Sequence, residues 1–427
     1  MARCAIILAL IVSAAASALP AAREKTAPYC DPAQCVLPDC RCSSLDIPGG
    51  LTPAETPQTV LITYDDAVNV LNFLNYTNLI FNRANPNGCN IKATYFLSHE
   101  YNNYTLVNDI YNRGHEIASH SITHRTNQDF WLANNEENWD KELADMRTMI
   151  EYYAGIPQSA IKGTRAPFLL NGGDTMWSSL SKNGFEWDCS WPTRNYVDPG
   201  MWPYTLDFLS QQDCQIGVCP VESYPGKWVV PMIDLFDASG NPCAMVDTCI
   251  VGDTADDVYN LLMTNFMRHY EGNRSPYGLF LHAAWLLDTN HLNGYRRFLD
   301  SLTTKDDVYL VSISQLLDWV KSPTPLSQID AFAPWRCDTP ITSIPCNERR
   351  CAYDGTKTPF GSERIMSMCN RQCPFFYPWY ENIYGSNPPT PWVLRFVFAC
   401  CVVIGHQSFE WLQKVQQSIH KLLNTHK

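Results

Sequence analysis

Positive charge is scarce in this sequence, which has 31 Lys and Arg residues against 43 Asp and Glu residues and a formal net charge of −12. A protein that binds a phosphate backbone needs a basic stripe, so this balance excludes nucleic acid as a partner. Charged residues make up only 17% of the chain, whereas hydrophobic residues make up 45%. The 427 residues can therefore bury a sizeable core, and the length fits one large α/β domain of roughly 250 to 300 residues with extensions.

Long apolar runs are absent too, since a membrane-spanning helix takes about 20 apolar residues. The run at residues 5–12 is shorter. It follows Arg3 and precedes a small-x-small cleavage site at residues 16–18. Residues 1–18 therefore predict a signal peptide rather than a membrane anchor. Residues 393–427 hold another short apolar stretch and then an amphipathic helix, for which docking on the protein is the simpler interpretation and membrane-surface attachment the alternative.

No Cys-x-x-Cys pair occurs among the 18 cysteines, which argues against a structural zinc site. So many cysteines are ordinary in an oxidising compartment and unusual in the cytosol, and we therefore expect disulfides in a secreted, extracellular protein. One cysteine lies in the signal peptide. The other 17 are an odd number, so at least one thiol lacks a partner within the chain. Two Pro-rich and Cys-rich extensions, residues 19–57 and 321–392, are predicted to be tied by disulfides.

Residues 58–320 alternate short apolar runs with longer amphipathic ones. The apolar runs predict buried strands at residues 59–64, 91–97, 116–119, 161–165, 185–189, 228–233, 278–282 and 308–313. Helical patterns lie between most of them, for example at residues 135–154 and 254–271, each followed by a Gly. This repetition predicts an α/β fold in which a parallel sheet closes into a distorted barrel of seven or eight β/α units, with an open doubly wound sheet as the alternative.

Polar residues follow the predicted strands at their carboxyl ends, where a parallel barrel forms its active site. The first strand runs into Asp65 and Asp66, and adjacent residues on an extended backbone point to opposite sides, so the two carboxylates can take different roles. The third strand ends before His120 and His124, whose spacing places both on one face of a helical turn, close enough to hold one ion. One carboxylate with two histidines leaves metal positions open for water and substrate.

Three further strand ends carry chemistry. Arg165 ends the fourth strand in an apolar setting, which requires a carboxylate partner. Asp188 follows the fifth strand between two aromatic residues, and His282 ends the seventh strand inside an apolar run. Each residue alone is as well explained by core packing. Together, at the same ends of the strands, they indicate one constellation.

These five segments, in this order and spacing, resemble the five motifs of the polysaccharide deacetylases, carbohydrate esterase family 4. Thr63-Tyr-Asp-Asp-Ala67, Arg165-Ala-Pro-Phe168 and Leu281-His-Ala-Ala-Trp285 are most similar to the insect gut-type chitin deacetylases that lack a chitin-binding module. The resemblance implies a monomeric hydrolase that removes the N-acetyl group from N-acetylglucosamine residues of chitin or chitooligosaccharides in an extracellular matrix or the gut lumen. The 13 Trp, 21 Tyr and 18 Phe offer flat faces on which sugar rings can rest.

The resemblance also implies a role for each residue. Asp66, His120 and His124 would hold one Zn²⁺, Asp65 would act as general base on water, and Arg165 would orient Asp65. His282 would give a proton to the leaving nitrogen, held charged by Asp188, and the backbone N–H of Phe168 would stabilise the oxyanion. Trp191, Leu281 and Trp285 would wall a pocket for the acetyl methyl group.

Three alternatives stay open. An Asp-His-His set also describes non-haem iron oxygenases, although those enzymes use antiparallel double-sheet folds rather than alternating strands and helices. A chitin-matrix-binding protein could keep this fold without strong catalysis. Another acetylated polysaccharide, such as acetylxylan or peptidoglycan, could be the substrate, because the five motifs do not recognise the sugar.

Overall fold

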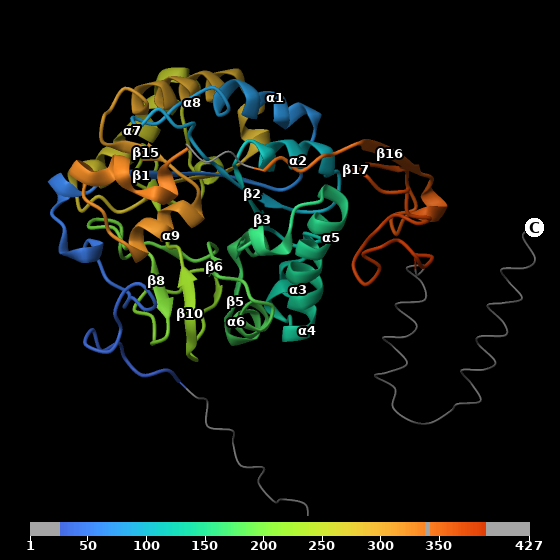
Figure 1. Cartoon of the computed structure of the whole chain (residues 1–427), viewed down its shortest axis with the longest axis horizontal. Coiled ribbons are helices and arrows are strands. Elements are labelled where there is room, and N and C mark those ends of the chain that lie inside the picture. The colour runs from blue at the N-terminus through green and yellow to red at the C-terminus, as the bar shows by residue number, and fades with distance from the viewer. Residues whose placement is uncertain (1–25, 338–341, 390–427) are drawn as a thin grey trace, which may run out of the picture.

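A computed structural model describes residues 26–337 and 342–389 of the chain (Figure 1). The predicted signal peptide and the predicted C-terminal helix lie outside these residues. Within the described ranges, no helix is both long enough and apolar enough to cross a membrane.

The centre of the fold is a nine-stranded sheet with the order β14-β1-β2-β3-β4-β6-β10-β8, and β15 also pairs with β1. Its strands are β1 (Gln58–Asp65), β2 (Thr94–Leu97), β3 (Glu116–Ser119), β4 (Gly163–Thr164), β6 (Trp187–Asp188), β8 (Tyr204–Leu206), β10 (Tyr224–Val229), β14 (Tyr277–His282) and β15 (Val308–Leu310). All pair in parallel except β8, which runs antiparallel to β10. The predicted α/β barrel class is confirmed, as a curled half-barrel whose two edges, β14 and β8, are not hydrogen-bonded to each other within the described residues.

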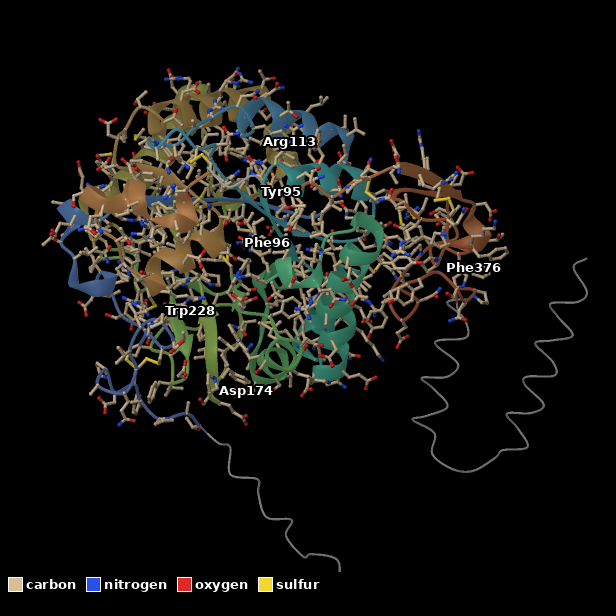
Figure 2. The ribbon with its side chains drawn as sticks, viewed as in Figure 1. Tyr95, Phe96, Arg113, Asp174, Trp228 and Phe376 are labelled. Atoms are coloured by element: carbon tan, nitrogen blue, oxygen red, sulfur yellow. A yellow bond between two sulfur atoms is a disulfide. The ribbon has the colours of Figure 1, made fainter. Side chains whose placement is uncertain are left out.

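Alternate residues of the strands enter two different cores, as the twofold period of a strand requires. On β1, Val60 and Ile62 pack into the core beneath the outer helices, whereas Leu61 packs into the core on the inner side of the sheet. Tyr95 and Phe96, neighbours on β2 near the centre of the molecule (Figure 2), divide between the same two cores. Burial on both faces explains why these strands are near-continuous apolar runs in the sequence.

Nine α-helices of the described residues surround the sheet (Figure 1): α1 (Val70–Leu79), α2 (Tyr104–Asn112), α3 (Gln128–Leu132), α4 (Glu136–Trp139), α5 (Asp145–Ala154), α6 (Gly173–Lys182), α7 (Ala255–Glu271), α8 (Thr289–Leu302) and α9 (Ile313–Lys321). The predicted helix at 254–271 forms as α7, whose first turn is capped by the Thr254 side chain. The predicted helix at 135–154 is instead divided into α4, a π-helical segment (Asp140–Ala144) and α5. A wider turn of this kind is often functional, and here it brings Glu142 inward, fully buried.

Seven disulfides tie the described chain together: Cys30–Cys42, Cys35–Cys40, Cys89–Cys337, Cys214–Cys219, Cys243–Cys249, Cys346–Cys369 and Cys351–Cys373. Two of them close the N-terminal extension and two staple the C-terminal hairpin of β16 (Glu348–Tyr353) and β17 (Arg364–Cys369), which packs on α2 and α5. Among the cysteines of the described residues, Cys189 has no disulfide partner and is buried in the inner core.

The chain between β6 and α7 departs furthest from regular β/α alternation. The predicted strand at 228–233 is divided at Pro231 into β10 and β11 (Met232–Ile233), and β11 pairs with β7 (Pro192–Thr193) instead of continuing the main sheet. Pro231 lacks the N–H that a continuous ladder needs. Short pairs follow, including β12 (Leu235–Phe236) with β13 (Pro242–Cys243). This irregular segment forms a wall beside the strand ends.

Candidate active site

The parallel register places Asp65 and His282 next to each other. Asp65 at the end of β1 pairs with His282 at the end of β14 and with Phe96 of β2. Asp65 continues the inward-facing series of Leu61 and Thr63, so its carboxylate enters the site from a rigid, buried strand. Asp66 then leaves the strand with a φ of 75°, and its side chain remains 41% exposed.

The two histidines approach each other without a helix, which corrects the helical turn expected from their spacing. Residues 120–124 form an irregular loop after β3, in which Ser121 has a φ of 86° and His124 a φ of 40°. The two imidazole rings still lie 4.9 Å apart. Glu142 holds this loop, because its carboxylate accepts hydrogen bonds from the backbone N–H groups of Ile122 (3.1 Å) and Thr123 (2.9 Å) and from the Thr123 hydroxyl (2.6 Å).

Asp66, His120 and His124 form a compact ligand set, with one side-chain ligand atom of each lying within 4.8 Å of the others. Asp66 Oδ1 and His124 Nε2 are 3.7 Å apart, and two atoms that bind one ion at about 2.0–2.2 Å lie no more than about 4.4 Å apart. His120 Nδ1 lies 2.8 Å from the Arg165 carbonyl, which can only accept, so Nδ1 carries the proton. His120 Nε2 therefore presents a buried lone pair with no hydrogen-bond partner within the described residues, and Asp65 Oδ2 lies 3.8 Å from it. This donor set fits a divalent metal ion.

Arg165 holds Asp65 in the way its position in the sequence predicts. Its guanidinium is fully buried and donates hydrogen bonds to Asp65 Oδ1 at 2.6 Å, to Thr63 Oγ1 at 2.8 Å and to the Cys189 carbonyl at 2.7 Å. The guanidinium also lies 3.9 Å from the centre of the Phe96 ring. A buried ion pair with this many additional bonds has one geometry, so the Asp65 carboxylate is fixed before any substrate binds.

His282 has a carboxylate partner other than the predicted one. Its Nδ1 lies 2.7 Å from Asp247 Oδ2, which also accepts the backbone N–H of His282 at 3.0 Å. Burial lowers the pKa of His282, but the hydrogen bond that its ring donates to Asp247 and the charges of Asp65, Asp247 and Asp66 outweigh it and raise the pKa to about 9. His282 is therefore protonated at neutral pH, with Nε2 3.8 Å from Asp66 Oδ2.

Asp188 supports a different part of the site. It is fully buried and accepts hydrogen bonds from Thr164 Oγ1 and from the Ser190 hydroxyl, both at 2.8 Å. The Ser190 hydroxyl in turn accepts the backbone N–H of Ala166 at 2.7 Å. Asp188 therefore positions the segment that carries Arg165 and Phe168, because the parallel register pairs it with Thr164 and not with the end of β14.

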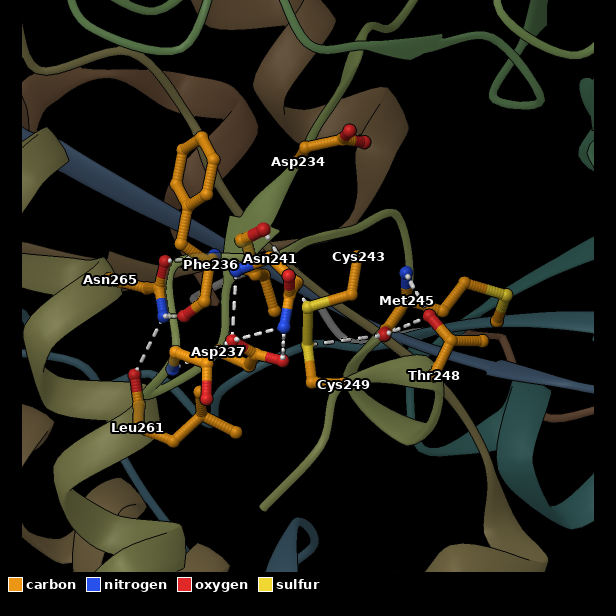
Figure 3. The surroundings of a disulfide bond; sticks show 12 residues. Asp234, Phe236, Asp237, Asn241, Cys243, Met245, Thr248, Cys249, Leu261 and Asn265 are labelled. Atoms are coloured by element: carbon orange, nitrogen blue, oxygen red, sulfur yellow. Dashed lines mark hydrogen bonds between the residues drawn. A yellow bond between two sulfur atoms is a disulfide. The ribbon is translucent and has the colours of Figure 1, made fainter.

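Asp247 lies in a small ring closed by a disulfide, and the sequence reasoning did not identify it. Cys243 and Cys249 are joined around it, and Figure 3 shows this disulfide beside the turn in which Thr248 bonds the Met245 carbonyl at 2.8 Å. The adjoining strand is held by the Asn265 side chain, which accepts a hydrogen bond from the backbone N–H of Phe236 and donates one to the Phe236 carbonyl. The sequence signal for Asp247 is an acidic residue between two cysteines that are six positions apart, Cys243 and Cys249.

Two cavities meet at His282. The first, of about 400 Å³, is lined by Asp65, Asp66, His124 and His282 and by the exposed side chains of Leu71, Tyr101 and Leu287. The second, of about 600 Å³, is lined by His282, Phe168, Asp234, Arg194 and the 242–248 loop. Both volumes lie within the usual range of ligand sites, about 300–1,000 Å³.

The three residues predicted to wall a pocket for the acetyl methyl group pack against other side chains. Trp191 and Leu281 are buried in separate cores, and Trp285 stacks on His291 with ring centres 4.3 Å apart. Within the described residues, neither of the two cavities has any of the three in its lining. The twofold period of a strand explains the direction of the Leu281 side chain. Because its neighbour His282 faces the site, Leu281 faces the core on the opposite side of the sheet.

Backbone strain gathers around the same residues. Nine non-glycine residues of the described chain have a positive φ, and five of them are Asp66, Ser121, His124, Phe168 and Leu169. Such conformations cost about 1–3 kcal/mol each and persist where the surrounding structure imposes them, commonly at functional sites. Phe168, with a φ of 57°, also packs its ring 5.0 Å from that of His124.

The chain is similar to several known proteins in sequence and in structure. A family model described as polysaccharide deacetylase matches residues 53–187. The chain is 42% identical over 385 residues to chitin deacetylase 8 of Bombyx mori, covering 89% of this chain and 98% of that protein. It is 39% identical over 379 residues to chitin deacetylase 1 of Bombyx mori, covering 84% and 69% of the two chains. Among solved structures, a family 4 carbohydrate esterase from Streptomyces lividans in complex with acetate matches with a TM-score of 0.34 and 18% identity, over 64% of this chain and 97% of that one.

Proposed function

Because the chain belongs to the polysaccharide deacetylase family, carbohydrate esterase family 4, we propose that it is a secreted, metal-dependent chitin deacetylase. The reaction is hydrolysis of the N-acetyl group of N-acetylglucosamine residues, which releases acetate and leaves a free amine on the polymer. One observation carries the proposal: the fixed carboxylate of Asp65, the protonated His282 and two of the three ligand residues, Asp66 and His124, line the same cavity, with the third ligand, His120, buried beside them.

The metal ion we propose is Zn²⁺, held by Asp66, His120 and His124. When bound, such an ion lowers the pKa of water towards about 7 and polarises the acetamide carbonyl. The buried lone pair of His120 Nε2 supports this assignment, because an imidazole nitrogen oriented by a carbonyl bond on its other side is the usual arrangement of a zinc ligand. An iron oxygenase would use the same three residue types, and the metal content of the active protein distinguishes the two.

The two proton transfers are assigned to Asp65 and His282. Asp65, fixed by Arg165, accepts a proton as water adds to the acetamide carbon. His282, kept protonated by Asp247, donates a proton to the amide nitrogen as the C–N bond breaks, because an unprotonated amide nitrogen is a very poor leaving group. The products are acetate and an amine. Asp65 then releases its proton to solvent, and His282 takes one up, before the next cycle.

The charge that develops on the carbonyl oxygen needs a donor of its own. We assign this role to the backbone N–H of Phe168, since the strained turn at 167–169 sits against His124 at the edge of the ligand set. Asp188 acts through its hydrogen bonds to Thr164 and Ser190, which hold this turn and Arg165 in place.

Chitin is the proposed polymer because both Bombyx mori relatives are named chitin deacetylases. Seven disulfides in the described chain support an extracellular location, since such bonds persist in oxidising compartments. A protein that only binds the matrix would not need a protonated histidine beside a fixed carboxylate. That alternative is therefore less well supported by the geometry.

The test is acetate release from a series of N-acetylglucosamine oligomers, with metal analysis of the active fraction. We expect release that stops with a chelator, returns with Zn²⁺ and is abolished by Asp65→Asn. Release from acetylxylan but not from these oligomers would overturn the substrate, and iron with oxygen consumption would overturn the reaction class. Folded protein that binds chitin but releases no acetate with any added metal would support the binding alternative instead.

A further inference from the structure

Among the described residues, the second cavity shares only His282 with the first, and its lining contains a carboxylate that the proposed reaction does not use. Asp234 follows β11 and is only 1% exposed, yet it lines this cavity together with Arg194, Phe168 and Met245. His282 belongs to the lining of both cavities, so the two spaces adjoin at the reacting centre.

Asp234 is incompletely satisfied by the protein. Its Oδ2 meets Arg194 Nε at 3.4 Å, but that guanidinium belongs to a side chain that is 55% exposed, so the pair is weak. Its Oδ1 is buried and accepts no hydrogen bond of ordinary length within the described residues. Burial raises the pKa of Asp234, and the nearby Gln215 amide opposes this shift but donates its 2.8 Å hydrogen bond to Asp213. Figure 3 shows Asp234 apart from the hydrogen-bonded residues around the Cys243–Cys249 disulfide. Burying a carboxylate oxygen without a donor is costly, and such an exception calls for a ligand.

The rest of the cavity has the character of a sugar site. Phe168, Ile216 and Met245 offer apolar surface, and Arg194 and Gln215 offer donors around the single unsatisfied acceptor. An apolar wall with a few convergent polar groups is the usual composition of a small-molecule site. At about 600 Å³ the space is large enough for more than a single functional group.

We propose that this cavity is a subsite for the sugar unit next to the reacting one, in which Asp234 Oδ1 accepts a hydrogen bond from that sugar. The inference rests on the proposed deacetylation and adds its chain-length preference. The donor is a hydroxyl group in a fully acetylated chain or an ammonium group in a chain that is already partly deacetylated. Because the two cavities adjoin at His282, a polymer that occupies both crosses the reacting centre, so units inside a chain are deacetylated in preference to those at its ends.

The test compares Asp234→Asn with Asp237→Asn, a matched control three residues along the chain. Asp237 is also buried, but its carboxylate bonds the Asn241 side chain and the backbone of its own turn and does not line the cavity. We expect Asp234→Asn to raise KM for pentamers and hexamers about tenfold, which corresponds to about 1.4 kcal/mol, with kcat little changed and turnover of the N-acetylglucosamine monomer unaffected. Asp237→Asn should keep the wild-type dependence on chain length.

Two further measurements test the subsite independently of the folding of Asp234→Asn and of catalysis. Ala244→Trp, which fills the cavity from a partly exposed position, should raise the KM of long oligomers even if Asp234→Asn fails to fold. Calorimetry of the same oligomers with the Asp65→Asn variant, with and without Asp234→Asn, measures their affinity for the subsite in the absence of catalysis. A larger loss with oligomers that contain glucosamine identifies the ammonium as the donor, and an equal loss identifies the hydroxyl.

The subsite is overturned if Asp234→Asn and Ala244→Trp both keep the wild-type dependence on chain length. Failure of the proposed function gives a different result, in which the wild type releases no acetate while binding still weakens on Asp234→Asn. The two inferences can therefore fail separately.

Discussion

The half of the site that accepts the proton and the half that donates it are built by different means. Asp65 ends β1 and His120 directly follows β3, both at the edge of the parallel sheet, and their side chains are 2% exposed. His282 is 36% exposed, and its partner Asp247 comes from an irregular loop closed by a disulfide. The first half is thus held by the fold as a whole, whereas the second is held by one short ring of chain.

This difference suits the two tasks. The metal ligands and Asp65 must keep a fixed geometry around one ion, and close packing within a sheet provides that rigidity. The acid must reach the leaving nitrogen of a bulky polymer, so it has to stand at the open junction of the two cavities. The ring closed by the Cys243–Cys249 disulfide gives the Asp247 carboxylate a defined position at this exposed place, beyond the end of the sheet.

The largest effect is expected in the buried half. His120→Ala removes the one ligand whose lone pair is buried without a hydrogen-bond partner in the described chain, so acetate release should fall below detection and the purified protein should lose its metal. Acetate assays and metal analysis of the same preparation check this. His291→Ala, which removes an imidazole stacked on Trp285 away from both cavities, is the control and should retain metal and activity. A His120→Ala protein with full metal content would contradict the ligand assignment.

A smaller effect is expected in the exposed half. Asp247→Asn keeps the size of the side chain but removes its charge, so kcat should fall by up to about 10²-fold, at the lower end of what acid–base catalysis contributes. Because His282 acts in its protonated form, activity is lost as the pH rises through its raised pKa, and the variant should lose activity at a lower pH than the wild type. The pH dependence of kcat/KM measures this shift. Asp188→Asn should leave the alkaline limb of the kcat/KM profile in place, because Asp188 contacts Thr164 and Ser190 and not His282. A shift of this limb in Asp188→Asn but not in Asp247→Asn would instead support Asp188 as the partner of His282.

The same contrast decides what could be predicted from the sequence. In the sheet, apolar runs of strand length mark the strands, and β3 was predicted with its observed ends. Because the carboxyl ends of parallel strands meet at one edge, the residues that follow them could be expected to converge, and the structure does bring Asp65, Asp66, His120, His124, Arg165 and His282 together.

The remainder depended on features that a periodic pattern does not contain. The spacing of His120 and His124 fits a helical turn, but positive φ angles at Ser121 and His124 produce the same proximity in a loop. Asp247 follows no strand, since it lies in the irregular chain between β6 and α7, and its partnership with His282 depends on a disulfide whose pairing no spacing establishes. The pairing of Asp188 with His282 was predicted only from the family resemblance, and the sheet order separates β6 from β14 by four strands, β1, β2, β3 and β4.

The smallest effect concerns the loop that joins the two histidines within the buried half. Burial raises the pKa of Glu142 to about 7, although its bonds to Thr123 and Ile122 and the charge of Arg125 oppose this. A carboxyl whose pKa is higher in the folded state contributes stability that is complete below its unfolded pKa of about 4.5 and is lost as the pH rises through about 7. Glu142→Gln should therefore gain in free energy of unfolding relative to the wild type between these two pH values, with a constant difference outside them. Denaturant unfolding across this range measures it, with the exposed Glu137→Gln from α4 as the control. Parallel curves for wild type and Glu142→Gln would mean that the histidine loop is held by the shape of this side chain and not by its charge.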